Sequence, residues 1–256
     1  MPARDSISTA IKGANASGRP AIVGFLTAGF PDKARFREHL IAVAAGTDVV
    51  EIGVPFTDPM ADGATIQRAS HAALVAGVSL AWILGELCAL PARPKAPLLL
   101  MSYLNPLLAY GLERLPKEAA SAGVAGFIVP DLPYEESADL RAELGREGLA
   151  LVQMVTPVTP AERLKMLCAA SEGFVYAVTM TGTTGKAVAV PDEVLAYLDR
   201  VRAVSPIPVC AGFGIRSREQ VARLKGHVDG VIVGSALVEV LERGEDATAW
   251  CLQLRV

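Results

Sequence analysis

Eight short apolar runs recur along the chain, separated by longer amphipathic segments, and this alternation constrains the fold more than any other feature. The runs cover residues 21–27, 48–53, 97–103, 126–130, 149–154, 173–179, 207–212 and 229–234. They are rich in Val, Ile and Leu with little polar alternation, which is typical of parallel strands buried on both faces. The segments between them often carry acidic residues early and basic residues late, which suits the dipole of a helix.

Eight strand–helix units in one chain predict an α/β fold, a single (β/α)8 TIM barrel over residues 1–256. The amphipathic segment 6–16 precedes the first run and predicts an additional N-terminal helix that closes the base of the barrel. The main competitor, a doubly wound open sheet, usually has a G-x-G-x-x-G turn after its first strand. Here that turn is "AGFPDK", and no linker or change of composition marks a domain boundary.

The composition and charge argue against several classes of function. Hydrophobic residues make up 52% and charged residues 20%, with a mean hydropathy of +0.38, which suits a doubly covered sheet. The net charge of −3 gives no support for nucleic-acid binding, and the scattered basic residues form no membrane-surface patch. The N-terminus lacks a signal-peptide core, and no apolar run reaches about 18 residues. We therefore expect a soluble, cytoplasmic protein.

Cysteine and histidine spacing gives no support for a metal site. The four cysteines lie far apart without a C-x-x-C pair, and the three histidines are isolated. The cysteines are expected to be small core residues in a reducing compartment.

Acidic residues collect at the end of the second run and in the loop after it. The active site of a TIM barrel lies at the C-terminal ends of its strands, so these acids are candidates for chemistry. Glu51 is interpreted as a general acid/base whose pKa is raised by apolar neighbours and nearby acids; the alternatives are an arginine pair or a loop cap. Asp62 is interpreted as a second, ionised carboxylate that holds a donor of the substrate. Asp58 is interpreted as a residue that organises the loop or contacts a partner.

Glycine-rich loops follow the sixth, seventh and eighth runs. Residues 211–217 read "AGFGIRS" and residues 233–239 read "VGSALVE", where Ser235 opens a helix. Free N–H groups at a helix start favour an anion, and these loops are the usual phosphate site of the barrel, although glycines also make plain tight turns. The loop 179–190 could close over the ligand. Neither Lys95 nor Lys186 has the context of a Schiff-base lysine.

The block E-x-G-x-P-F-[ST]-D-P-x-A-D-G over residues 51–63 is highly specific, and "FLTAGFP", "GFIVPDLP", "GFGI" and "VGSALV" accompany it. With these motifs the chain resembles the tryptophan synthase alpha subunit family over nearly its whole length. The resemblance implies retro-aldol cleavage of indole-3-glycerol phosphate to indole and glyceraldehyde 3-phosphate, without metal or organic cofactor. It also implies a beta subunit as partner, in an α2β2 heterotetramer, with pyridoxal phosphate only in that partner.

The resemblance also implies roles for individual residues. Glu51 would protonate the indole ring carbon and help to remove the glycerol hydroxyl proton, Asp62 would accept the indole N–H, and Tyr176 would lie beside Glu51. The substrate-binding positions it implies are Phe25, Tyr103, Ile128, Thr184 and Phe213, and the phosphate-binding positions are Gly185, Gly214, Gly234 and Ser235.

Several positions depart from the family pattern. Ala64 and Arg218 each stand at a position where proline is common in the family. The loop 179–185 also differs from the family pattern, and Met180 in it stands at a position that some members use for contacts between subunits. The altered loop keeps two alternatives open, a stand-alone indole-3-glycerol phosphate lyase releasing free indole and a partner-activating subunit with weak catalysis. A different phosphosugar barrel enzyme, such as an isomerase, would not need the apolar indole slot.

Overall fold

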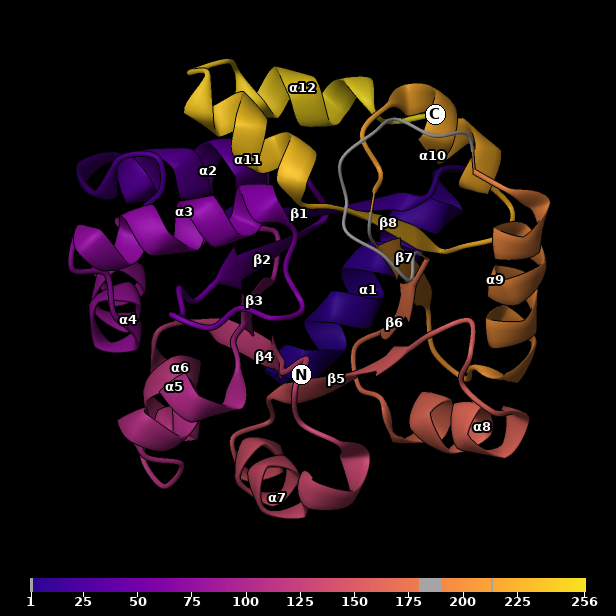
Figure 1. The fold of residues 1–256 in the computed structure, drawn as a ribbon, viewed down its shortest axis with the longest axis horizontal. Coiled ribbons are helices and arrows are strands. Elements are labelled where there is room, and N and C mark those ends of the chain that lie inside the picture. Colours follow the sequence, from indigo (N-terminus) through magenta and orange to yellow (C-terminus); the bar gives the residue numbers. More distant parts are fainter. Residues whose placement is uncertain (1, 180–189, 213) are drawn as a thin grey trace.

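The eight predicted strands form a closed parallel barrel in the order of the sequence, as the computed structural model of the chain shows (Figure 1). The structure describes residues 2–179, 190–212 and 214–256. The strands are β1 (Ala21–Thr27), β2 (Val49–Gly53), β3 (Leu98–Met101), β4 (Val124–Ile128), β5 (Ala150–Val155), β6 (Val175–Val178), β7 (Val209–Gly212) and β8 (Gly230–Val233). β8 pairs with β1 and closes the barrel, so the predicted (β/α)8 fold is confirmed.

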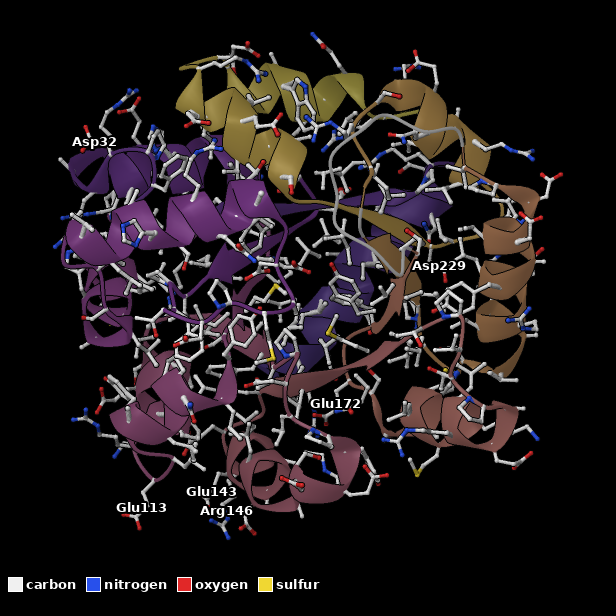
Figure 2. The ribbon with its side chains drawn as sticks, in the orientation of Figure 1. Asp32, Glu113, Glu143, Arg146, Glu172 and Asp229 are labelled. Atoms are coloured by element: carbon white, nitrogen blue, oxygen red, sulfur yellow. The ribbon has the colours of Figure 1, made fainter. Side chains whose placement is uncertain are left out.

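Helices surround the barrel in the described part of the chain (Figure 1). They are α1 (Ala3–Ala16), α2 (Phe36–Gly46), α3 (Ala64–Val75), α4 (Leu80–Cys88), α5 (Leu104–Tyr110), α6 (Leu115–Ser121), α7 (Ala138–Arg146), α8 (Ala161–Ala170), α9 (Asp192–Val204), α10 (Arg218–Leu224), α11 (Ser235–Glu242) and α12 (Ala247–Gln253), with 3-10 turns at Lys33–Arg35 and Tyr134–Glu136. Charged side chains such as Glu143 and Arg146 on α7 point away from the barrel and pair with each other (Figure 2).

Two layers of apolar side chains explain the continuous apolar runs. One face of each strand packs against the helices, in a cluster that includes Leu26, Ile52 and Leu100. The other face fills the barrel interior, in a cluster that includes Val49 and Leu99. Because both faces are covered, the strands do not need polar alternation, and the sequence shows little of it.

The predicted N-terminal helix is present and lies across the barrel. α1 packs against β1, β2 and β4 and buries Ile7, Ile11 and Ala14 among the interior side chains. The helix donates hydrogen bonds to the carbonyls of Gly148, Gly173 and Asp229, just before β5, β6 and β8. Its predicted position at the base of the barrel is therefore confirmed.

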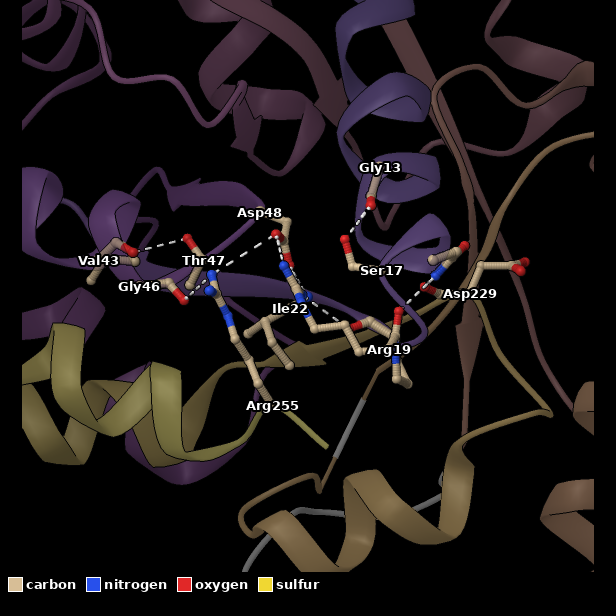
Figure 3. A network of polar contacts seen from close by, with 12 residues as sticks. Gly13, Ser17, Arg19, Ile22, Val43, Gly46, Thr47, Asp48, Asp229 and Arg255 are labelled. Carbon is tan, nitrogen blue, oxygen red and sulfur yellow. Dashed lines mark hydrogen bonds and ion pairs between the residues drawn. The ribbon is translucent and has the colours of Figure 1, made fainter.

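A polar network ties the start of β1 to the start of β2 (Figure 3). Both terminal nitrogens of Arg19 donate to the Asp48 carboxylate at 2.7 Å, and the Ile22 N–H donates to the same carboxylate at 2.8 Å. Arg255, near the C-terminus, lies 3.9 Å from that carboxylate and donates to the Gly46 carbonyl. The network lies at the N-terminal ends of the strands, opposite the ends that carry the candidate site residues.

Among the described residues, no single helix has the length and apolar character needed to cross a membrane. Taken together, α3 and α4 reach these criteria, and the two helices are bent by 83° at the break between them.

Candidate active site

Glu51 lies in the middle of β2 and its side chain belongs to the inward-facing set. It pairs in register with Phe25 on one side and Leu99 on the other. The residue is 1% exposed, and neither carboxylate oxygen has a hydrogen-bond partner in the described part of the chain. Burial alone raises the pKa of Glu51 to about 8, so the nearby acids expected from the sequence are not needed for this shift. At neutral pH the side chain is therefore a carboxylic acid that can donate a proton.

Asp62 comes from the loop between β2 and α3 and faces the same cavity as Glu51. Its Oδ2 accepts a hydrogen bond from the Tyr103 hydroxyl at 3.2 Å, and the Ala61 N–H donates to that hydroxyl at 2.9 Å. Burial raises the pKa of Asp62 to about 6, against the opposing effect of the Tyr103 hydrogen bond. Its pKa lies below that of Glu51, so between the two values one group is ionised and the other protonated.

Tyr176 on β6 lines this cavity with the two carboxyl groups. It is 4% exposed, and burial raises its pKa, with further contributions from the charges of Glu51 and Asp62. A Cβ added to Gly212, the partner strand's last residue, would lie 2.4 Å from the tyrosine hydroxyl. The glycine at the end of β7 is therefore required for the position of the Tyr176 ring.

Apolar side chains form the wall of the cavity around these polar groups. Phe25 is 4% exposed and its ring lies against Gly53, where an added Cβ would come within 2.5 Å of the ring. Ile66, Met101 and Ile232 also line the cavity. A flat aromatic ligand fits such a wall, because it can bury apolar surface while its polar atoms meet the carboxyl groups.

The other end of the cavity is formed by the loops after β7 and β8. Gly214, Gly234 and Ser235 line it, and Gly214 has a φ of +84°. Ser235 begins α11, whose first N–H groups lack intrahelical partners, so this end favours an anion. The β7 loop is held by a capping box between Ser217 and Gln220 at the start of α10.

Arg216 was not among the residues expected from the sequence. It lines the same cavity end and pairs with Glu239 of α11, which also accepts from Thr65 at 3.2 Å. The arginine within "AGFGIRS" was the available signal, because a cation beside a glycine-rich anion loop is a plausible ligand contact. Ile66, Met101 and Ile232 were also missed, since nothing local separates them from core residues.

The remaining expected residues have four outcomes. Tyr103 lies beside the main cavity and contacts Asp62 directly. Ile128 is fully buried in the barrel interior, in the cluster that contains Tyr176, and is not part of the cavity lining. Thr184, Gly185 and Phe213 lie outside the described residues. Asp58 is exposed, accepts from the Thr57 hydroxyl at 2.5 Å and does not line the cavity.

Within the described ranges, no group of three or more His, Cys, Asp or Glu side chains is arranged to hold a metal ion. A closed (β/α)8 barrel defines the class: a TIM-barrel protein with two carboxyl groups of raised pKa in one cavity at its C-terminal face.

Comparison with known proteins identifies the family. A family model described as "Tryptophan synthase alpha chain" matches residues 11–254. The tryptophan synthase alpha chain of Nitratidesulfovibrio vulgaris is 48% identical over 241 residues, 94% of either chain, and that of Solidesulfovibrio magneticus is 45% identical over 250 residues, 97% of this chain and 98% of the relative. A solved structure of Mycobacterium tuberculosis tryptophan synthase matches with a TM-score of 0.89 and 37% identity, covering 97% of this chain and 96% of that one. The chain belongs to the tryptophan synthase alpha chain family.

Proposed function

We propose that this chain is the alpha subunit of a tryptophan synthase and cleaves indole-3-glycerol phosphate to indole and glyceraldehyde 3-phosphate. Family membership supports a lyase of tryptophan biosynthesis, and it favours the subunit over a stand-alone lyase or a mere activator. The observation that carries the reaction is the pairing of a buried Glu51, neutral at pH 7, with Asp62 in one cavity.

Glu51 acts first as an acid. The substrate carries its glycerol phosphate chain on a carbon of the indole ring, and that carbon must gain a proton before the carbon–carbon bond can break. Neither oxygen of Glu51 is engaged in the described part of the chain, so its proton is free for the ring carbon. Once ionised, the same carboxylate accepts the proton of the glycerol hydroxyl. The bond pair returns to the ring, an aldehyde forms and Glu51 regains its proton.

Asp62 stabilises the positive charge that the ring acquires. A protonated indole ring carries its charge largely at the N–H side, and an ionised Asp62 accepts a hydrogen bond from that N–H. The interaction is stronger in the charged intermediate than in the neutral substrate, so it lowers the barrier rather than only tightening binding. Tyr103 holds the carboxylate in place through the 3.2 Å hydrogen bond.

The phosphate binds at the other end of the cavity. Gly214, Gly234 and Ser235 let backbone N–H groups approach it, and the start of α11 supplies the favourable dipole. Gly185 and Thr184 of the loop after β6 are proposed to complete the site. The chain needs no cofactor of its own for this chemistry.

A beta subunit with pyridoxal phosphate is the proposed partner, in an α2β2 complex. Asp58 is exposed on the loop between β2 and α3, and Met60 on the same loop is 82% exposed. A large apolar side chain left in solvent next to the site favours a protein contact there. Because Asp62 belongs to this loop, a partner bound to it would act on the position of a catalytic carboxylate.

Indole release from indole-3-glycerol phosphate, measured with and without added beta subunit, tests the proposal. Strong stimulation by the beta subunit supports the alpha subunit role. Equally fast rates in both conditions favour the stand-alone lyase, and absence of indole in both conditions refutes the reaction itself.

A further inference from the structure

We propose that Thr27 is a positioning residue for Asp62 and acts through one water molecule held in a small cavity between them. This inference rests on the proposed function for its catalytic meaning, because it concerns the carboxylate that would hold the indole N–H. The water site between β1 and the β2–α3 loop is argued from geometry alone and does not depend on the proposed reaction.

Thr27 is the last residue of β1 and belongs to the inward-facing set with Val23 and Phe25, four and two residues before it. It is 2% exposed, and its Oγ1 has no hydrogen-bond partner among the described residues. Hydroxyl groups buried to this degree are normally hydrogen-bonded to protein or to an ordered water, because an unsatisfied one is destabilising. The hydroxyl therefore indicates a polar ligand at this point.

A small cavity lies at Thr27 and extends to Asp62 and Tyr103. Its volume is about 20 Å³, and one water needs roughly 10–15 Å³ in the same measure. The cavity is therefore large enough for one water and too small for a substrate. Phe25, Asp62, Ile66 and Met101 line both this cavity and the main one.

The polar groups around the small cavity match the needs of a bound water, which takes two to four partners. The Thr27 hydroxyl and the Asp62 carboxylate supply two. Ser102 Oγ also lines the cavity and donates to the Tyr103 carbonyl at 2.9 Å, so its lone pairs remain as acceptors. Ser70 is already committed to both backbone groups of Phe56.

Such a water donates to Asp62 and favours its ionised form, as the Tyr103 hydroxyl does from another direction. Other ionisable groups lie around Asp62. Glu51 from β2, Tyr176 from β6 and Arg216 from the loop before α10 line the main cavity with it. Asp131 acts electrostatically on Tyr103, and Asp58 is an exposed residue of the same loop as Asp62. A Thr27 variant leaves all of them in place, so a change in the Asp62 titration reports on the Thr27 hydroxyl.

The test is the titration of Asp62 by NMR of carboxyl-labelled protein, with the resonance assigned from Asp62→Asn. Thr27→Val keeps the shape and removes the hydroxyl, and we expect it to raise the Asp62 pKa by roughly half a unit or more. Thr27→Ser keeps the hydroxyl and should titrate like the wild type. Thr47→Val is the matched control, because it removes another buried hydroxyl that lies away from the site. That hydroxyl donates to the Val43 carbonyl at 2.9 Å, and its loss should not shift the pKa of Asp62.

A high-resolution crystal structure of the wild type supplies the second readout, and we expect one water within hydrogen-bonding distance of both Thr27 Oγ1 and Asp62. A Thr27→Val titration equal to the wild type, equal shifts in the Val and Ser variants, or no water that bridges the two groups would overturn the proposal. If Thr27→Val does not fold, the Ser variant and the crystal structure still decide it. Neither readout needs turnover, so failure of the proposed reaction would be seen separately, as absence of indole.

Discussion

The Tyr103 hydroxyl donates to the Asp62 carboxylate at 3.2 Å while it accepts the Ala61 N–H at 2.9 Å. One phenol after β3 thus holds both the backbone and the functional side chain of the loop between β2 and α3. Phe56, at the start of that loop, stacks on the same ring with centroids 5.3 Å apart.

Tyr103→Phe should weaken catalysis by freeing the loop and destabilising ionised Asp62. The lost hydrogen bond currently lowers the Asp62 pKa, so the variant should show a higher pKa and a loss of roughly three- to tenfold in kcat/KM near pH 7. Tyr197→Phe is the control, because its hydroxyl bonds the Val155 carbonyl in the core at 2.9 Å. The control should lower stability without moving the pH profile; an unmoved profile in Tyr103→Phe would contradict the role given to this residue.

The pH profile of kcat/KM should be bell-shaped. The active form has Asp62 ionised and Glu51 protonated, so activity falls below the Asp62 pKa of about 6 and above the Glu51 pKa of about 8. Steady-state rates of indole release from pH 5 to 9, in buffers of constant ionic strength, measure both limbs. Activity that keeps rising above pH 8.5 would show that Glu51 is not needed in its protonated form.

Glu51→Gln should abolish indole release while phosphate binding persists. The amide has the same shape as the acid and cannot give its proton to the ring carbon, and Gly234 and Ser235 at the phosphate end are unchanged. We expect turnover to fall at least a hundredfold, with inorganic phosphate binding by calorimetry within about twofold of the wild type. Turnover above about a tenth of the wild type, a barrier change under ~1.4 kcal/mol, would rule out this role for Glu51.

The same substitution should change the pH dependence of stability. Glu51 ionises near pH 4.5 in the unfolded chain and near 8 in the folded one, so the folded state binds an extra proton between these values and wild-type stability falls as pH rises through this window. Glutamine does not titrate, so its contribution to the free energy of unfolding does not change with pH. The stability advantage of Glu51→Gln should therefore grow from pH 5 to pH 8 by an amount on the order of 4 kcal/mol, and then level off. Urea unfolding of both proteins at several pH values measures this difference, which a surface-exposed Glu51 would not produce.

Gly212→Ala should damage the site through Tyr176. The new methyl group would lie 2.4 Å from the tyrosine hydroxyl, so the ring must move, at a cost of about 1–3 kcal/mol in stability and with a loss of activity. Gly13→Ala is the matched control: nothing lies within 4 Å of its added Cβ in α1, and an alanine there should stabilise the helix by about 0.5–1 kcal/mol. Thermal unfolding and indole release of both variants test the contrast, and equal effects would contradict it.

The sequence by itself determined the barrel and the end of it at which the candidate site residues lie. Strands buried on both faces leave continuous apolar runs, so all eight were visible, although β4 begins at Val124, two residues before the predicted run, because Val124 pairs with Leu98 beyond a register shift. Glu51 stood out because a carboxyl group inside an apolar run has no local reason to be there. The glycine loops after β7 and β8 were identifiable because glycine lets the backbone approach a ligand closely, and this property can be read from the sequence alone.

Only the tertiary structure decided how these residues act on one another. Tyr103 and Asp62 are separated by 41 residues, and the parallel pairing of β2 with β3 brings the segments after these two strands into contact. Arg216 lines the end of the cavity that favours an anion and forms an ion pair there with Glu239. Ile128 lies in the interior cluster and does not line the cavity. The raised pKa of Glu51 is likewise a property of the closed fold, because removal of water on every side requires neighbours from several strands at once. The local sequence pattern specifies which face of a strand or helix a side chain occupies. The packing of segments distant in the sequence specifies which other side chains it contacts.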